Sequence, residues 1–268
     1  MNPTAPLRVY VAGIGLIAPG LPDWRSAAEM LTGRVPYAAA PAVLPLPSML
    51  PAAERRRASR VVKVALATGG EAVAMAGQDA ATLATVFAAS GGDGHNCHAL
   101  CEALASDDRR ISPTRFHNSV HNAAAGYWGI ATGAMAPCQV LCAYDASFAA
   151  GLLEAAVQVR TTGQPILLVA YDAEYPEPLQ ATRPIPDAAG VALVLTPNQA
   201  ASSLACLDIR LTGDKPTPMA DGRLETLRRT IPPLRALPLL ALLARREPGN
   251  AVIEYLGPEH IAVAVTSC

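Results

Sequence analysis

Two apolar runs in the middle of the chain most constrain its fold. Residues 165–171 (Pro-Ile-Leu-Leu-Val-Ala-Tyr) and 190–195 (Gly-Val-Ala-Leu-Val-Leu) carry almost no polar side chain, which is typical of strands buried on both faces. Segments with apolar residues at helical spacing, such as 59–77 and 146–159, alternate with these runs. The alternation predicts a layered α/β/α domain with a mainly parallel sheet.

The rest of the chain continues this pattern up to Thr196-Pro197 and then changes character. We expect residues 1–197 to form one part of the domain and residues 198–268 a smaller part that completes it. Gly13-Ile14-Gly15 follows a short strand and predicts a tight turn. The remaining expected elements are strands at 8–12, 82–90, 138–144 and 204–211, helices at 23–31, 93–105 and 122–132, one or two proline-interrupted helices within 221–246, and a hairpin of 252–256 with 261–265.

Composition indicates a protein that meets another protein. Hydrophobic residues make up 51% of the 268 residues and charged residues only 16%, which is low for a free-standing monomer. The net charge of −1 gives no field that would attract nucleic acid or an anionic membrane, and no apolar run is long enough to span a bilayer. Six cysteines without regular spacing predict reduced thiols, and we expect a cytoplasmic protein.

A strand, a turn and a helix surround Asp145. The apolar segment 138–144 precedes this residue, and residues 146–159 repeat apolar side chains at helical spacing, so Asp145 is expected at the helix N-cap. A cap of this kind stabilises a helix by about 0.5–2 kcal/mol. A thiol at such a position would become a thiolate near neutral pH, whereas a carboxylate is a poor acyl acceptor.

The most unusual passage is residues 115–128 (Arg-Phe-His-Asn-Ser-Val-His-Asn-Ala-Ala-Ala-Gly-Tyr-Trp). Two histidines, His117 and His121, and two asparagines, Asn118 and Asn122, precede a helix of small residues. One interpretation is a packed connection in which these side chains satisfy backbone groups. The other is a surface that lines a pocket or a subunit seam.

Other chemical motifs are weaker. Gly13 and Gly15 lack the third glycine of a dinucleotide-binding turn. The cluster of His95, Cys97, His98 and Cys101 lacks the spacing of structural zinc sites. Cys138 and Cys142 are expected to be buried strand thiols, which are inert. The sequence therefore predicts neither a metal nor a cofactor.

Together these passages resemble the β-ketoacyl synthase family of the thiolase superfamily, and most closely its chain-length-factor branch. The similarity extends from Arg8 to Leu195 and rests on three segments. It implies a thiolase-like fold in which the N-terminal half is complete and the C-terminal half is strongly shortened. The three segments are 8–20 (Arg-Val-Tyr-Val-Ala-Gly-Ile-Gly-Leu-Ile-Ala-Pro-Gly), 116–126 (Phe-His-Asn-Ser-Val-His-Asn-Ala-Ala-Ala-Gly), and 183–187 (Arg-Pro-Ile-Pro-Asp) with 190–195.

The resemblance also implies a lost nucleophile. Residues 143–147 (Ala-Tyr-Asp-Ala-Ser) fall where the family has Thr-Ala-Cys-x-x, so Asp145 takes the place of the catalytic cysteine. Active ketosynthases also need two histidines from the second half, and only His260 follows Asp145. By resemblance, the chain is a non-catalytic subunit that pairs with an active ketosynthase across the sheet edge, receives chains on acyl carrier protein, and belongs to the bacterial aryl polyene or xanthomonadin pigment type.

A chain length factor shapes the tunnel for the growing acyl chain, and side-chain volume sets where such a tunnel stops. By size and position the candidates are Phe116, Met135, Tyr144 and Phe148, although ordinary core packing is the simpler interpretation of each. Cys142 is a further candidate for the tunnel or the subunit interface. Two other hypotheses stay open. One is a stand-alone decarboxylase or acyl hydrolase that uses Asp145 as a base near His117 or His121, and the other is a homodimeric pseudoenzyme that holds carrier proteins.

Overall fold

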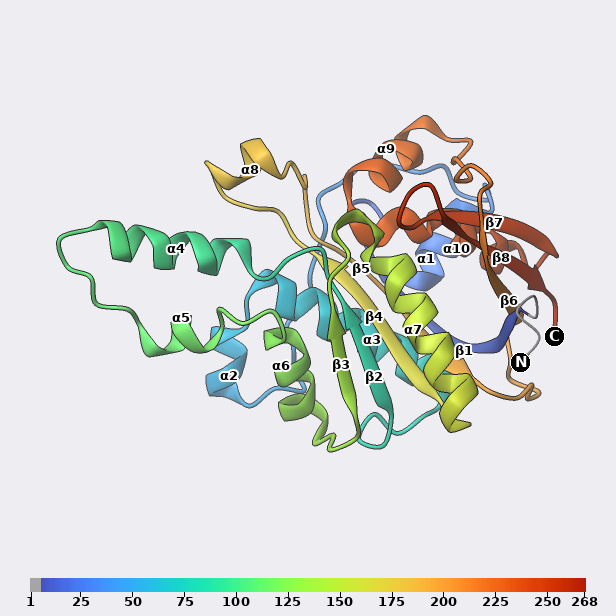
Figure 1. The fold of residues 1–268 in the computed structure, drawn as a ribbon, viewed down its shortest axis with the longest axis horizontal. Helices are drawn as coiled ribbons and strands as arrows, with labels where there is room; N and C mark the ends of the chain where they lie inside the picture. The colour runs from blue at the N-terminus through green and yellow to red at the C-terminus, as the bar shows by residue number, and fades with distance from the viewer. Residues whose placement is uncertain (1–5) are drawn as a thin grey trace.

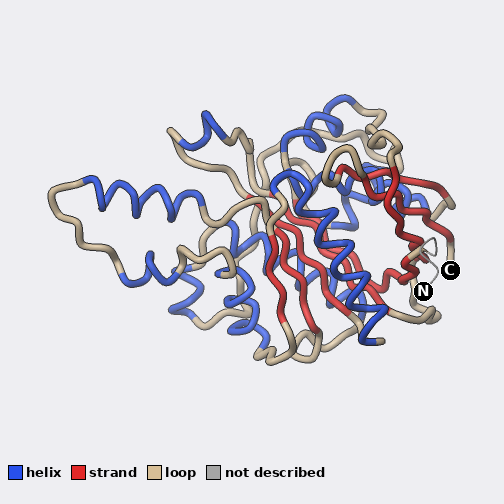
Figure 2. The backbone as a smooth tube through the Cα atoms, in the orientation of Figure 1, coloured by secondary structure: helices blue, strands red, loops and turns tan. Residues whose placement is uncertain are grey.

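A single mixed β-sheet organises the protein. The computed structural model describes residues 6–268, in which eight strands pair in the order β3-β2-β4-β5-β1-β6-β8-β7 (Figures 1 and 2). The last three strands in the chain extend the sheet beyond β1, so both parts of the sequence contribute to one sheet. The strands are β1 (Leu7–Ile17), β2 (Ala84–Ala88), β3 (Cys138–Leu141), β4 (Ile166–Asp172), β5 (Ala189–Thr196), β6 (Ala205–Thr212), β7 (Gly249–Glu254) and β8 (His260–Thr266).

The prediction of a mainly parallel sheet is wrong. Within the described chain, β2 pairs in parallel with β3 and β4, whereas the five other strand pairs are antiparallel. The apolar runs β4 and β5 are buried on both faces as expected, but β5 runs back along β4. The segment between them contains only the four-residue helix α8 (Leu179–Thr182), which is too short to carry the chain back for a parallel pairing.

Helices cover both faces of the sheet and create two apolar cores. Helix α7 (Ser147–Thr162), with α1 (Trp24–Leu31) and α10 (Leu237–Arg245), packs on one face. Helices α3 (Arg60–Ala76) and α6 (Ala123–Thr132) pack on the other. Figure 1 shows α7 in front of the sheet and α3 behind it. The predicted α/β/α layering is confirmed.

Gly13 and Gly15 lie inside β1, so the predicted tight turn is wrong. A Cβ atom at Gly13 would lie 2.1 Å from the carbonyl oxygen of Ala72, and one at Gly15 would lie 2.0 Å from that of Thr68. Both oxygens belong to α3. Glycine is therefore needed because the backbone of the covering helix approaches the strand directly, not because the chain turns.

A helical arm projects from the body of the molecule (Figure 1). It consists of α4 (Gly94–Ala105) and α5 (Pro113–His117), and the Asn96 amide joins them by donating to the carbonyl oxygen of Arg115 at 2.8 Å. Short helices α2 (Ala52–Arg57) and α9 (Gly222–Thr230) and the 3₁₀ turns η1 (Tyr144–Ala146) and η2 (Pro232–Ala236) complete the described chain. No helix among residues 6–268 is both long enough and apolar enough to cross a membrane.

Candidate functional site

The turn between β3 and α7 is the most distinctive local structure. This elbow, residues 142–147, lies where the parallel strands β2, β3 and β4 reach their carboxyl ends. Tyr144 adopts a left-handed backbone with φ of 52°, and its side chain is 59% exposed. The Ser147 hydroxyl stabilises the turn through two hydrogen bonds. It donates to the carbonyl oxygen of Tyr144 at 2.7 Å and accepts from the amide of Ala143 at 3.0 Å. A strained backbone of this kind persists only where the surroundings over-determine it.

Asp145 does not cap the helix, so that prediction is wrong. The 3₁₀ turn η1 comes before α7, and the N-cap residue of α7 is Ala146, which has no side chain able to cap it. The Asp145 carboxylate instead lies 2.7 Å from a guanidinium nitrogen of Arg183 and 3.3 Å from one of Arg235. The carboxylate therefore forms charge-assisted contacts with two cations from distant segments in place of the helix amides.

Asp145 is one member of a chain of six alternating charges. Arg235 also pairs with Glu254, and Glu254 lies 3.6 Å from Arg228. Arg228 donates two hydrogen bonds to Glu225 at 2.7 and 2.8 Å, and these hold the pKa of that carboxyl down to about 2. The elbow is therefore tied to α9, η2 and β7, which all come from the last part of the chain.

Arg183 also covers one face of the exposed tyrosine. Its guanidinium carbon lies 3.8 Å from the centre of the Tyr144 ring, which is close enough for a cation–π interaction. The side chain of Arg183 is only 17% exposed, and its Nη2 has no hydrogen-bond partner in the described structure. Arg183 thus holds both Asp145 and Tyr144 in place.

A buried carboxyl lies behind the elbow at the end of β4. Asp172 is 3% exposed and accepts hydrogen bonds from the amide of Ser90 at 3.1 Å and from its hydroxyl at 2.7 Å. Burial raises the pKa of Asp172 to about 7. The Cys142 thiol donates to the carbonyl oxygen of Ser90 at 3.2 Å, so Ser90 connects the elbow to this carboxyl.

Cys138 and Cys142 are exposed, not buried as the sequence predicted. The reason is the position of β3 at the edge of the sheet, where one side of the strand has no neighbour. An apolar run alone does not distinguish an edge strand from a central one.

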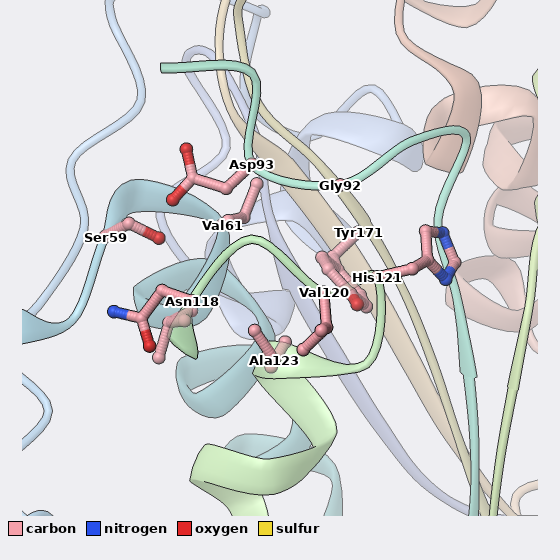
Figure 3. A pocket seen from close by; sticks show the side chains of 11 residues that line it. Ser59, Val61, Gly92, Asp93, Asn118, Val120, His121, Ala123 and Tyr171 are labelled. Carbon is pink, nitrogen blue, oxygen red and sulfur yellow. The ribbon is translucent and has the colours of Figure 1, made fainter. Parts of the chain in front are cut away.

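The residues of the 115–128 passage lie around cavities at the base of the arm. Asn118 is buried and donates its amide to the Tyr127 hydroxyl at 3.3 Å, whereas Nε2 of His121 lies 3.4 Å from the carbonyl oxygen of Ala89. Asn118 and His121 line a narrow cavity of about 10 Å³. Figure 3 shows the side chains around it. His117 and Asn118 line a second cavity of about 470 Å³. Asn122 occupies the N-cap position of α6 without a side-chain cap bond.

The predicted site residues thus form two separate groups. The cavities at the base of the arm are lined by His117, Asn118 and His121, and none of the elbow residues lines them. Among residues 6–268, the ion pairs of Asp145 are with arginines, and neither histidine pairs with it. The decarboxylase hypothesis, in which Asp145 acts near His117 or His121, stays a prediction.

The four tunnel candidates differ in environment. Phe148, in the first turn of α7, is fully buried in the core, whereas Phe116 is 67% exposed and Met135 is 95% exposed. Tyr144 is exposed at the elbow. The bulky side chains chosen for their size are therefore mostly surface residues rather than core.

Sequence reasoning missed Arg183 and Arg235 as partners of Asp145. Arg235 lies 90 residues further along the chain, and no local pattern connects it with the elbow.

The histidines and cysteines of residues 95–101 do not form a metal site. Instead, His95 lies 3.9 Å from Glu174 and His98 lies 3.3 Å from Glu102. The part of the chain that the structure describes contains no group of three metal-capable side chains.

Comparison with known proteins identifies the fold. Residues 24–236 match the model of the β-ketoacyl synthase N-terminal domain, whereas no curated protein matches the sequence. The structure is similar to a chain of the ketosynthase ApeO in complex with its chain length factor ApeC from Xenorhabdus doucetiae, with 22% identity, a TM-score of 0.72 and coverage of 96% of this chain and 98% of that one.

Two further solved structures have the same fold. The first is the complex AntDE:AntF, a type II polyketide acyl carrier protein with its ketosynthase, with 13% identity, a TM-score of 0.74 and coverage of 99% of this chain and 100% of that one. The second is the ishigamide ketosynthase/chain length factor, with 13% identity, a TM-score of 0.70 and coverage of 97% and 99%. The predicted thiolase-like α/β fold is confirmed.

Proposed function

Because this chain belongs to the β-ketoacyl synthase family, we propose that it is a chain length factor-like subunit that performs no condensation itself and pairs with an active ketosynthase. The proposal includes elongation of acyl chains on acyl carrier protein in a type II polyketide or aryl polyene system. Structures similar to this chain are complexes of a ketosynthase with a chain length factor or with an acyl carrier protein.

The state of Asp145 is the observation that carries this proposal. Condensation in the family requires a cysteine and two histidines, whereas the elbow presents a carboxylate held in two ion pairs. Both carboxylate oxygens are engaged by guanidinium groups, and a carboxylate cannot replace a thiolate as the acyl acceptor. Of the described histidines only His260 follows the elbow, and it begins β8, where its Nδ1 accepts from the amide of Tyr255 at 3.3 Å.

The free edge of β3 supports the pairing. The carbonyl oxygens of Pro137 and Leu141 accept from β2, so the alternating residues Cys138 and Val140 turn their backbone groups toward the free edge. An unprotected strand edge is a template for pairing with another chain. Six large apolar side chains that are exposed come from the arm, from residues 118–132 between the arm and β3, and from the segments on either side of β3, namely Leu104, Phe116, Val120, Ile130, Met135 and Tyr144.

Co-expression with a ketosynthase from the same genome tests the proposal. We expect a stable one-to-one complex on size exclusion, and malonyl elongation only when both subunits are present. Elongation or decarboxylation by this chain alone would contradict the proposal. A homodimer with no affinity for any ketosynthase would favour the pseudoenzyme hypothesis instead.

The variant Asp145→Ala separates the subunit from the enzyme hypothesis. Removal of the carboxylate leaves Arg183 and Arg235 close together without their shared anion. We therefore expect the free energy of unfolding to fall by roughly 1–3 kcal/mol, a range that already allows for the 40% exposure of the Asp145 side chain. The partner's elongation rate should remain near its wild-type value at a temperature where the variant is folded. If Asp145 were a catalytic base, turnover would instead be lost, and the conservative variant Asp145→Asn would lose it equally.

A further inference from the structure

The run Arg55-Arg56-Arg57 is the one dense cluster of like charges in the sequence, and its members have different environments. Arg55 donates to the carbonyl oxygens of Ser48 and Leu50 at 3.2 and 3.0 Å, so it fixes the preceding loop. Arg57 lies 2.9 Å from Glu54. Arg56 has no ion pair within residues 6–268, so its charge is uncompensated.

Arg56 and Arg57 line a cavity of about 380 Å³ between α2, the start of α4, and α5. The other donors on its wall include the guanidinium of Arg115 and the hydroxyls of Ser59, Ser112 and Thr114. The bond from Asn96 to the carbonyl of Arg115 ties the two arm helices together at this point. Ser59, Asp93 and Asn118 are shared with the narrow cavity in Figure 3, which lies beside this one.

The charges around the cavity leave an excess of positive charge. Arg115, like Arg56, has no ion pair in the described part of the chain. The acidic residue on the wall is Asp93, whose carboxylate accepts from the amide of Asn96 at 3.0 Å and caps α4. His95 is also on the wall, and it lies 3.9 Å from Glu174. Arg56 and Arg115, both exposed, therefore line the cavity without an ion pair in the described part of the chain.

We propose that this cavity binds the oxyanion of a phosphate ester. The planar forks of Arg56 and Arg115 match phosphate oxygens, and three neutral hydroxyls supply further donors. The net charge of −1 provides no field for nucleic acid, so a small phosphate ester is the ligand class we propose. The phosphate is carried either by a free small molecule or by the prosthetic arm of a carrier protein.

Calorimetric titration of the full chain at low ionic strength tests the site with inorganic phosphate, pyrophosphate and acetate. We expect saturable binding of phosphate, tighter binding of pyrophosphate, and weaker binding of acetate, because a carboxylate offers fewer oxygens to the donors. Arg56→Glu and Arg115→Glu should each weaken phosphate binding by about tenfold or more. Arg160→Glu is the matched control, because Arg160 is an exposed residue of α7 without an ion pair in the described chain.

The outcomes are separable. Three results would overturn the proposal, provided that thermal melting shows each variant folded. They are the absence of saturable phosphate binding, an equal affinity for acetate and phosphate, and a loss of phosphate affinity in Arg160→Glu equal to that in the two test variants. No partner subunit is needed, so failure of the proposed function leaves this test intact.

A comparison of carrier protein with and without its phosphopantetheine arm identifies the source of the phosphate and rests on the proposed function. If Arg56→Glu weakens binding of the loaded carrier as well as of phosphate and leaves the unloaded carrier unaffected, the source is the carrier arm; if it weakens binding of phosphate and pyrophosphate but of neither form of the carrier, the source is a free molecule.

Discussion

The Asp172 carboxyl makes stability depend on pH at the level of a single residue. Burial raises its pKa from 3.8 in the unfolded chain to about 7 in the folded protein. Between these values the folded state holds a proton that the unfolded state has lost. The stability that Asp172 contributes through this bound proton is therefore fully present below about pH 4. It is lost as the pH rises through 7, and the free energy of unfolding falls by up to roughly 1.4 kcal/mol per pH unit.

The variant Asp172→Asn should remove this dependence. Its side-chain oxygen can still accept from Ser90, and its charge does not change with pH. Denaturant titrations from pH 4 to 8 should show a slope of stability against pH that is less negative in the variant than in the wild type. Equal slopes in the two proteins would mean that Asp172 has an ordinary pKa. Ser90→Ala provides a second check, because loss of the hydroxyl donor should raise the pKa of Asp172 further.

At the level of elements, the edge strand β3 is expected to determine partner binding. The amide of Val140 faces the free edge, so Val140→Pro removes a donor needed for pairing and leaves the ladder to β2 intact. We expect the variant to fold with a thermal midpoint near that of the wild type and to lose the ketosynthase complex on size exclusion.

The opposite edge of the sheet supplies the control. In β7, the backbone of Val252 bonds outward to Thr217, so Asn250, two residues earlier, also faces outward. Asn250→Pro should therefore leave the complex intact. Loss of the complex in both variants, or in neither, would exclude β3 as the contact strand.

Elements with strong local signals were predictable from the sequence, whereas their pairing was not. The apolar runs of β4 and β5 and the glycine that ends α3 were recognisable because each depends on nearby residues. The direction of β5 and the edge position of β3 depend on contacts far along the chain. The same holds for the candidate site, where Asp145 was identified but its arginine partners were not.

At the scale of the whole molecule, we expect residues 1–197 and 198–268 to fold as one unit. Strand β6 pairs with β1, and every residue of η2 is buried, in contact with α7, β4 and β5. Leu234, Leu237, Leu239 and Leu240 are fully buried, and exposing four such side chains costs about 6–12 kcal/mol. This cost is of the same order as a typical total stability of about 5–15 kcal/mol.

A fragment of residues 1–197 should therefore lack a cooperative unfolding transition and should bind a dye specific for exposed apolar surface. Co-expression of residues 198–268 as a separate chain should restore the transition, because β6 and η2 can then return to the sheet and to the ion pairs that join Arg235 to Asp145 and Glu254. A sharp transition in residues 1–197 alone would show instead that the last part of the chain is an appendage. The ion pairs of the elbow would then be dispensable for the fold.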